Sequence, residues 1–174
     1  MQTNDYSVTI KDMKILGIDP GTAITGFGVI KVEGGKLAVQ GCGVIRTPAK
    51  QAQSKRLAHI FRELETIIKK TKPDVVAVEK LFFINNVKTA MTVGEARGVV
   101  LLAIEKAGLP LFEYTPLQVK LAITGYGKAE KSQIQLMVKQ ILKLKVTPQP
   151  DDMADALAIA ITHAFRQTKY VEKK

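Results

Sequence analysis

Short runs of Ile, Val and Leu dominate the first quarter of the chain. They cover Lys14–Asp19, Gly26–Val32 and Lys36–Ile45, and Gly34-Gly35 between the last two runs is typical of a hairpin turn. We therefore predict three successive strands, of which the last two are antiparallel.

The pattern then changes to the spacing of an amphipathic helix. From about Ala52 to Lys70 the apolar residues fall on one helical face, and this face comprises Leu57, Ile60, Phe61, Leu64, Ile67 and Ile68. Pro73 ends this helix. The run DVVAVE that follows, Asp74–Glu79, predicts a buried strand.

The second half of the chain alternates between helical and strand patterns. We expect a helix over Val87–Lys106, a short strand around Pro110–Tyr114, a helix in KAEKSQIQLMVKQILKL, and a buried last helix in DDMADALAIAITHAFRQ. Residues 115–127 give no clear pattern. The expected fold class is α/β, with a mixed sheet covered by helices. We expect a flexible leader over residues 1–13, one domain over 14–168 and a frayed tail over 169–174.

Composition narrows the class of protein. The 174 residues include 26 Lys and Arg against 16 Asp and Glu, so the formal net charge is +10 and a polyanion is the first partner to consider. The lone Cys42 suits a reducing compartment and a packing role. No apolar run approaches the roughly 20 residues that cross a bilayer. We expect a cytoplasmic protein without a membrane partner.

Two apolar strands end in a carboxylate. Asp19 closes one strand and is followed by Pro20-Gly21, while Glu79 closes DVVAVE. For Asp19 alone, a structural turn is the simpler interpretation, because Asp-Pro-Gly is good turn chemistry. If the two strands are neighbours, however, both side chains face one point, and two anions in a poorly hydrated cleft need a proton or a cation between them.

The third acidic element is PDDMADALA. Asp152 and Asp155 are three residues apart and share one face of the last helix, although acidic residues in a first turn also cap a helix. Together with Asp19 and Glu79 they supply four hard oxygen donors, which suit Mg²⁺ or Mn²⁺ and not zinc. On a basic protein, this set favours two-metal hydrolysis of phosphodiesters. The two histidines, His59 and His163, are interpreted as packing or surface residues.

Several segments, taken in order, closely resemble the RuvC family of Holliday-junction resolvases, the crossover junction endodeoxyribonucleases. They are ILGIDPGTAITGFGVI, VAVEKLFF, GEARGV, FEYTPLQVK with AEKSQIQ after it, and DDMADALAIAITH, and they span about Lys14 to Phe165. The resemblance implies a ribonuclease H-like fold with a five-stranded mixed sheet. It also implies paired, Mg²⁺-dependent nicking of four-way junction DNA by a homodimer, with a branch-migration complex of RuvA and RuvB type proteins as partner.

The resemblance also assigns individual residues. Asp19, Glu79, Asp152 and Asp155 match the family's catalytic, metal-binding carboxylates, with two Mg²⁺ ions per site and Mn²⁺ as a substitute. For DNA binding, Phe82 matches an aromatic placed against a junction base, and Lys120 and Lys131 match basic residues near the scissile phosphate. For these three residues, core packing or a solvated surface is the alternative. Lys80 and Glu95 depart from the family pattern, which has glutamine at both positions.

Two other functions compete with this one. GIDPGT resembles the first phosphate-binding turn of actin-like ATPases, but that class needs two domains and a second phosphate loop. A catalytically silent, junction-binding protein would use charge alone, yet a pure phosphate binder gains nothing from four anions near its ligand.

Overall fold

The computed structural model describes residues 6–80 and 87–172. In chain order the elements are β1 (Tyr6–Ile10), β2 (Met13–Asp19), β3 (Ile24–Glu33), β4 (Lys36–Arg46), α1 (Gln53–Thr71), β5 (Val75–Glu79), α2 (Val87–Lys106), β6 (Leu111–Tyr114), α3 (Pro116–Thr124), α4 (Lys131–Ile141), α5 (Asp151–Arg166) and β7 (Thr168–Glu172).

A five-stranded mixed sheet forms the centre of the molecule. Its order is β4-β3-β2-β5-β6, in which β3 is antiparallel to both of its neighbours, β2 and β4, and β5 and β6 run parallel to β2. The hairpin between β3 and β4 turns at Gly34 and Gly35, whose φ angles of 55° and 76° suit glycine. The predicted antiparallel strands and mixed sheet are confirmed.

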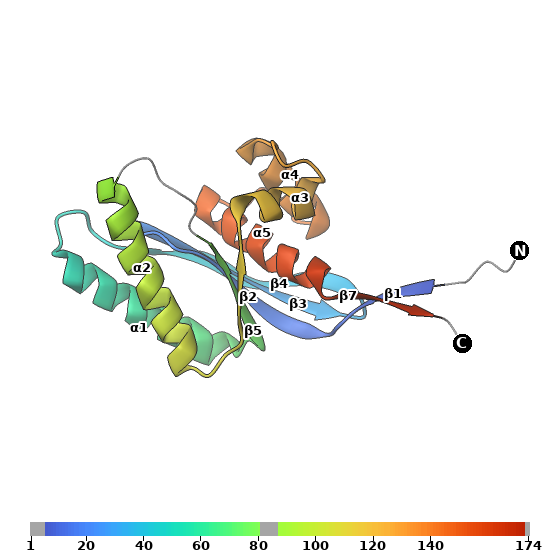
Figure 1. Ribbon diagram of the computed structural model, residues 1–174, viewed down its shortest axis with the longest axis horizontal. Helices are drawn as coiled ribbons and strands as arrows, with labels where there is room; N and C mark the ends of the chain where they lie inside the picture. Colours follow the sequence, from blue (N-terminus) through green and yellow to red (C-terminus); the bar gives the residue numbers. More distant parts are fainter. Residues whose placement is uncertain (1–5, 81–86, 173–174) are drawn as a thin grey trace, which may run out of the picture.

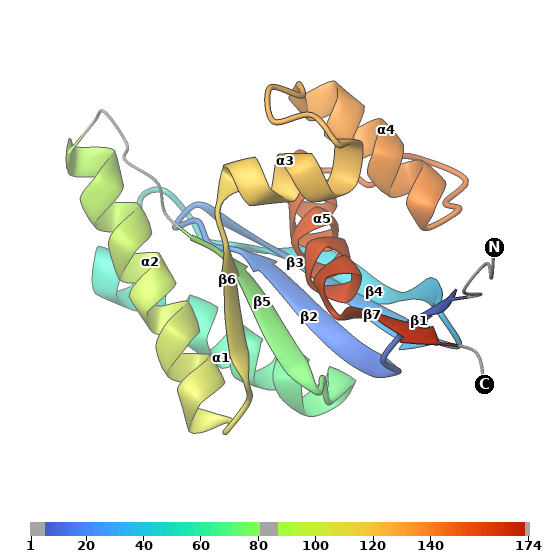
Figure 2. The same cartoon turned by 45° about the vertical axis from the view of Figure 1, so that its right-hand side comes forward.

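Helices cover both faces of this sheet (Figure 1). On one face α1 and α2 lie side by side, and their apolar residues pack on side chains of β2, β3 and β5 such as Leu16, Val29 and Val78. On the other face α5 lies across β2 and β3, with α3 and α4 on its outer side (Figure 2). The sheet thus has one apolar cluster on each face, as a three-layer α/β fold requires.

Helix α5 lies unusually close to the sheet. A Cβ atom at Gly17 would collide with the backbone carbonyl of Ala156, and one at Gly26 would collide with the backbone carbonyl of Asp152. All α5 residues from Ala156 to Ala164 are buried, which confirms the prediction of a buried last helix. Gly26 therefore permits the close approach of the first turn of α5 to β3, and Gly17 permits that of the following turns to β2.

Helix α3 occupies the region whose pattern was unclear. Its start is fixed by a capping box, in which the Thr115 hydroxyl accepts from the Gln118 amide and the Gln118 side chain accepts from the Thr115 amide. Its end is a left-handed Gly125. The connection from β6 to α4 is therefore helical.

The first and last strands form a separate two-stranded ribbon. β1 and β7 pair antiparallel, from Tyr6 opposite Glu172 to Ile10 opposite Thr168. This pairing differs from the flexible leader and frayed tail that the sequence suggested, because strand pairing supplies backbone hydrogen bonds that local patterns do not reveal. Among residues 6–80 and 87–172, no helix combines the length and apolar character needed to span a bilayer.

Candidate active site

Parallel pairing brings two carboxylates together at one edge of the sheet. The parallel pairing of β2 with β5 places Ile18 opposite Val78. Asp19 and Glu79 are the next residues of these two strands and therefore lie at neighbouring strand ends. This is the arrangement that the sequence predicted. It places both acids at the carboxyl ends of parallel strands, where α/β proteins build their sites.

The third acidic element meets these strand ends from the α5 side. Pro150 is the N-cap residue of α5, and no side chain caps the helix, so capping does not explain the aspartates. Gly26 is the pairing partner of Asp19 on β3 and also contacts the backbone of Asp152. The same glycine thus brings the first turn of α5 against the end of β2.

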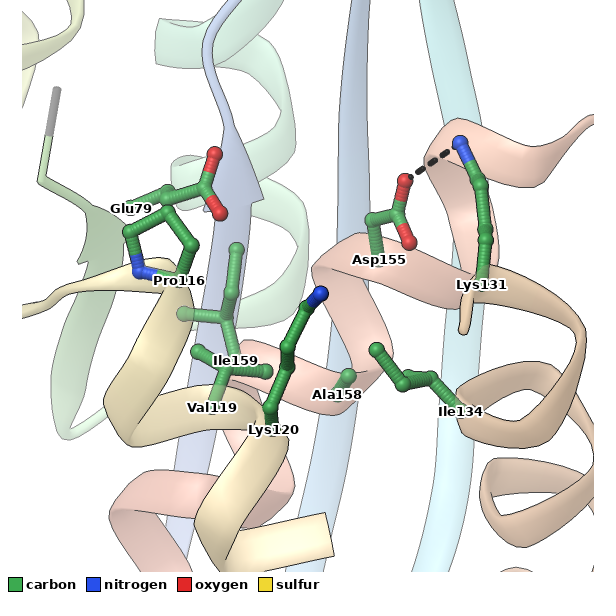
Figure 3. A pocket seen from close by; sticks show the side chains of 9 residues that line it. All are labelled: Glu79, Pro116, Val119, Lys120, Lys131, Ile134, Asp155, Ala158 and Ile159. Carbon is green, nitrogen blue, oxygen red and sulfur yellow. Dashed lines mark ion pairs between the residues drawn. The ribbon is translucent and has the colours of Figure 1, made fainter. Parts of the chain in front are cut away.

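A hollow of about 190 Å³ opens beside these acids and collects four of the expected residues. Figure 3 shows the carboxylates of Glu79 and Asp155 on opposite sides of this hollow, with the amine of Lys120 pointing between them. Lys131 lies beside Asp155, on the side away from Glu79, and forms an ion pair with it. We call this cavity the lysine hollow; its remaining lining is Pro116, Val119, Ile134, Ala158 and Ile159.

Asp152 lines a different hollow of about 420 Å³. This cavity lies between the turn after β2, the start of α1 and the α2 region, and we call it the Arg56 hollow. Its lining residues are Gly21, Thr22, Ala23, Ile24, Arg56, Thr92, Val93 and Asp152. Glu79, Asp155, Lys120 and Lys131 thus line one cavity and Asp152 lines the other, whereas Asp19 belongs to the lining of neither.

Burial and mutual repulsion disfavour negative charge at this edge. Desolvation, followed by the charges of Glu79, Asp155 and Asp152, raises the pKa of Asp19 to about 7. Burial also raises the pKa of Glu79, and Asp155 adds to that increase. A group of acids with raised pKa values needs either protons or a cation to become stable.

Lys131 supplies one positive charge in the structure. Its Nζ lies 2.9 Å from an Asp155 oxygen and 3.5 Å from an Asp151 oxygen. Desolvation lowers the pKa of Lys131, but the hydrogen bond to Asp155 and the attraction of Asp155 outweigh it, so the net pKa is raised. Burial outweighs the same ion pair at Asp155, whose pKa is also raised.

The donor set fits a divalent cation by its chemistry. Asp19, Glu79, Asp152 and Asp155 offer only carboxylate oxygens, which Mg²⁺ and Mn²⁺ prefer. Within the described ranges, 6–80 and 87–172, no three acidic side chains already converge tightly enough to enclose an ion. Asp155 instead forms an ion pair with Lys131.

The other residues that the sequence analysis named lie in different surroundings. Phe82 lies outside the described residues, so its proposed contact with a base stays a prediction. Lys80 is exposed next to Glu79. His163 is buried, and its Nδ1 lies 2.7 Å from the hydroxyl oxygen of Tyr114, which confirms a packing role. Cys42 is a partly buried member of the core, as expected.

Two charged residues near the site were not predicted. Asp151, which directly precedes Asp152, is a second partner of Lys131. Arg56 is one of several basic residues of α1, and nothing in its spacing distinguishes it. Only the tertiary structure brings Arg56 to the same cavity as Asp152.

Comparison with known proteins agrees with this geometry. The family model described as crossover junction endodeoxyribonuclease RuvC matches residues 15–163. The RuvC protein of Ruminiclostridium cellulolyticum is 56% identical over 151 residues, which cover 87% of this chain and 91% of that protein. The RuvC protein of Brevibacillus brevis is 57% identical over 152 residues, with 87% and 92% coverage.

The fold matches as well. The solved structure of Thermus thermophilus RuvC in complex with a Holliday junction substrate superposes with a TM-score of 0.82 and 38% sequence identity. The match covers 91% of this chain and all of that chain. The expected ribonuclease H-like architecture is thus confirmed, and this chain belongs to the RuvC family of crossover junction endodeoxyribonucleases.

Proposed function

We propose that this chain is a structure-selective endonuclease that resolves four-way DNA junctions by paired cuts in strands of like polarity, in recombination and DNA repair. The observation that carries the proposal is the acidic edge itself: Asp19, Glu79 and Asp155 are electrostatically coupled beside two lysines. Family membership and the Thermus thermophilus relative solved with a Holliday junction substrate support the choice of DNA. They favour this function over an actin-like ATPase.

The carboxylates would hold the divalent cation, Mg²⁺ or Mn²⁺. We assign this role to Asp19, Glu79, Asp152 and Asp155, with room for two ions because the set is spread between two strand ends and one helix turn. When bound, the ions would activate water and stabilise the leaving oxygen of an in-line displacement. The rigid strands and the buried α5 hold the ligands in place before substrate arrives.

Lys120 and Lys131 would bind the DNA phosphate. Lys120 points into the lysine hollow, and Lys131 stands at the first turn of α4 beside Asp155. A cation bound by Asp155 would compete with Lys131 for that carboxylate, and the ammonium group would then be available to the DNA backbone. Lys131 therefore neutralises a carboxylate in the free protein and a phosphate in the complex.

Paired cuts require two sites, and we propose a homodimer. Met91 and Leu102 on α2 are 65% and 53% exposed, and they lie on one side of the helix because 11 residues separate them. An interface between two copies through this side would remove both from water.

Phe82 would stack on a junction base near the site. A branch-migration complex of RuvA and RuvB type is the expected partner in the cytoplasm.

Nicking of a labelled synthetic four-way junction tests the function. We expect Mg²⁺-dependent, symmetric cuts by the wild type, no cuts with a chelator and little cutting of linear duplex. Glu79→Gln should lower the cleavage rate by about 10²–10³, as the loss of a group that stabilises transition-state charge does. Glu63→Gln, on the exposed face of α1, is the matched control. Tight junction binding without cutting under any divalent cation would leave a silent binding protein instead.

A further inference from the structure

The Arg56 hollow has a cation fixed by a chain of hydroxyl groups. Arg56 Nε donates to Thr47 Oγ1 at 2.8 Å, and that hydroxyl donates to the Thr22 carbonyl at 2.6 Å. The Thr22 hydroxyl in turn donates to the Thr92 carbonyl at 2.6 Å. These bonds connect the first turn of α1, the end of β4, the turn after β2 and α2. The Nε of the guanidinium group is therefore anchored to a hydroxyl that is itself bonded within the protein.

The charge of Arg56 has no acidic partner among the described residues. The five ion pairs of this part of the chain involve Lys31, Arg97, Lys106 and Lys131, the last of which forms two. Arg56 uses Nε within the protein, and its two terminal nitrogens form no hydrogen bond to residues 6–80 or 87–172, so both can donate the forked pair of bonds that phosphate accepts. A partly buried cation anchored through its Nε is suited to an anion that arrives with a ligand.

The composition of the cavity wall indicates which anion fits. Ile24, Val93 and Ala23 give the hollow an apolar side, and the only acid in its lining is Asp152, which belongs to the acidic edge. The volume of about 420 Å³ lies within the range of small-ligand pockets. A phosphate with an attached sugar matches this combination of one cation and an apolar wall.

Both hollows border the acidic edge, because one is lined by Asp155 and Glu79 and the other by Asp152. We propose that the cut DNA strand runs through both hollows, and that Arg56 binds the phosphate that neighbours the scissile phosphate on the Asp152 side. This inference rests on the proposed function, and it names Arg56 as a substrate-positioning residue that the family comparison does not assign.

Methylphosphonate substitution tests the contact directly. Junctions would carry a single neutral methylphosphonate at each phosphate within two positions of the cut, on either side. Binding is measured with Ca²⁺ and cleavage with Mg²⁺, for the wild type, Arg56→Ala, Arg56→Lys and Arg62→Ala. Arg62 is the matched control, because it is exposed on the same helix and its loss changes the net charge equally.

We expect one flanking methylphosphonate to weaken binding by the wild type and by Arg62→Ala about tenfold. The same substitution should have no effect on Arg56→Ala relative to its own unmodified junction. Arg56→Lys should regain part of the affinity, because it keeps the charge and loses the Nε bond to Thr47. The salt dependence of binding by Arg56→Ala should fall by about one counterion, whereas that of Arg62→Ala should not change. Each variant is compared with itself, so a difference in folding stability does not imitate the result.

Two outcomes separate this inference from the proposed function. In the first, the wild type cuts junctions, but every methylphosphonate weakens junction binding by Arg56→Ala as much as it weakens binding by the wild type. The subsite is then refuted and the nuclease function stands. If the wild type binds with the expected Arg56-dependent phosphate contact but cuts under no divalent cation, the function is refuted and the subsite stands.

Discussion

Replacing Asp19 with asparagine should stabilise the metal-free protein while it abolishes cleavage. Asp19 is held in a desolvated position at the end of β2, and Glu79, Asp155 and Asp152 repel its charge. Asparagine has nearly the same shape and no charge. The substitution therefore removes the repulsion and also removes one candidate metal ligand, whereas junction affinity should stay near that of the wild type.

The size of the effect follows from the pKa. In the unfolded chain the Asp19 carboxyl has its ordinary pKa of 3.8, and in the folded protein its pKa is about 7. Between these values the folded state binds the proton and the unfolded state does not, so the free energy of unfolding falls as the pH rises through this window. A difference of this size corresponds to about 4 kcal/mol above pH 7. Asp19→Asn should recover about 2–4 kcal/mol of it.

Urea unfolding at pH 5, 6, 7 and 8 with a chelator measures the prediction. The advantage of Asp19→Asn over the wild type should grow as the pH rises, and saturating Mg²⁺ should reduce it at pH 8 because the cation stabilises only the wild-type site. Glu63→Gln removes an exposed charge and should show no such trend. If Asp19→Asn were no more stable than the wild type at pH 8 without metal, the idea of a repulsive, desolvated Asp19 would be wrong.

Two further variants test the packing of the site and the assembly. Gly26→Ala should destabilise the protein by about 1–3 kcal/mol, because its Cβ would push the first turn of α5 away from β3. Thermal unfolding and Mg²⁺ titration measure this effect, and unchanged metal affinity would contradict a role in placing Asp152. Leu102→Asp should yield monomers in sedimentation experiments and single, unpaired nicks in junctions. A dimer that persists would place the interface elsewhere.

The strand ends of the site could be predicted because their signals are local. The apolar runs before Asp19 and Glu79 identify buried strands, and the ends of two such strands lie together when the strands are parallel neighbours in one sheet. The structure confirms this pairing. Asp152 and Asp155 followed from helical spacing alone. Each of these four residues could be identified from the few residues next to it in the sequence, and sequence patterns describe only such short stretches.

Other features depend on contacts between distant residues. The β1–β7 ribbon joins residues more than 150 positions apart, a separation that local sequence patterns do not span. Arg56 acquires its position only through Thr47 and the turn after β2. Helix α3 is a different case, because Thr115 and Gln118 have the spacing of a capping box and its start was recognisable.

The placement of α3 and α4 on the outer side of α5 separates the site into two mechanical parts. The acids belong to β2, β5 and the buried α5, whereas Lys120 and Lys131 belong to helices that pack chiefly on α5 and on each other. Substitutions on α3 and α4 change the surroundings of these two lysines without altering the pairing of β2 with β5. Changes in these two helices can therefore adjust how strongly the lysines bind phosphate. The positions of the carboxylates at the ends of β2 and β5 stay the same.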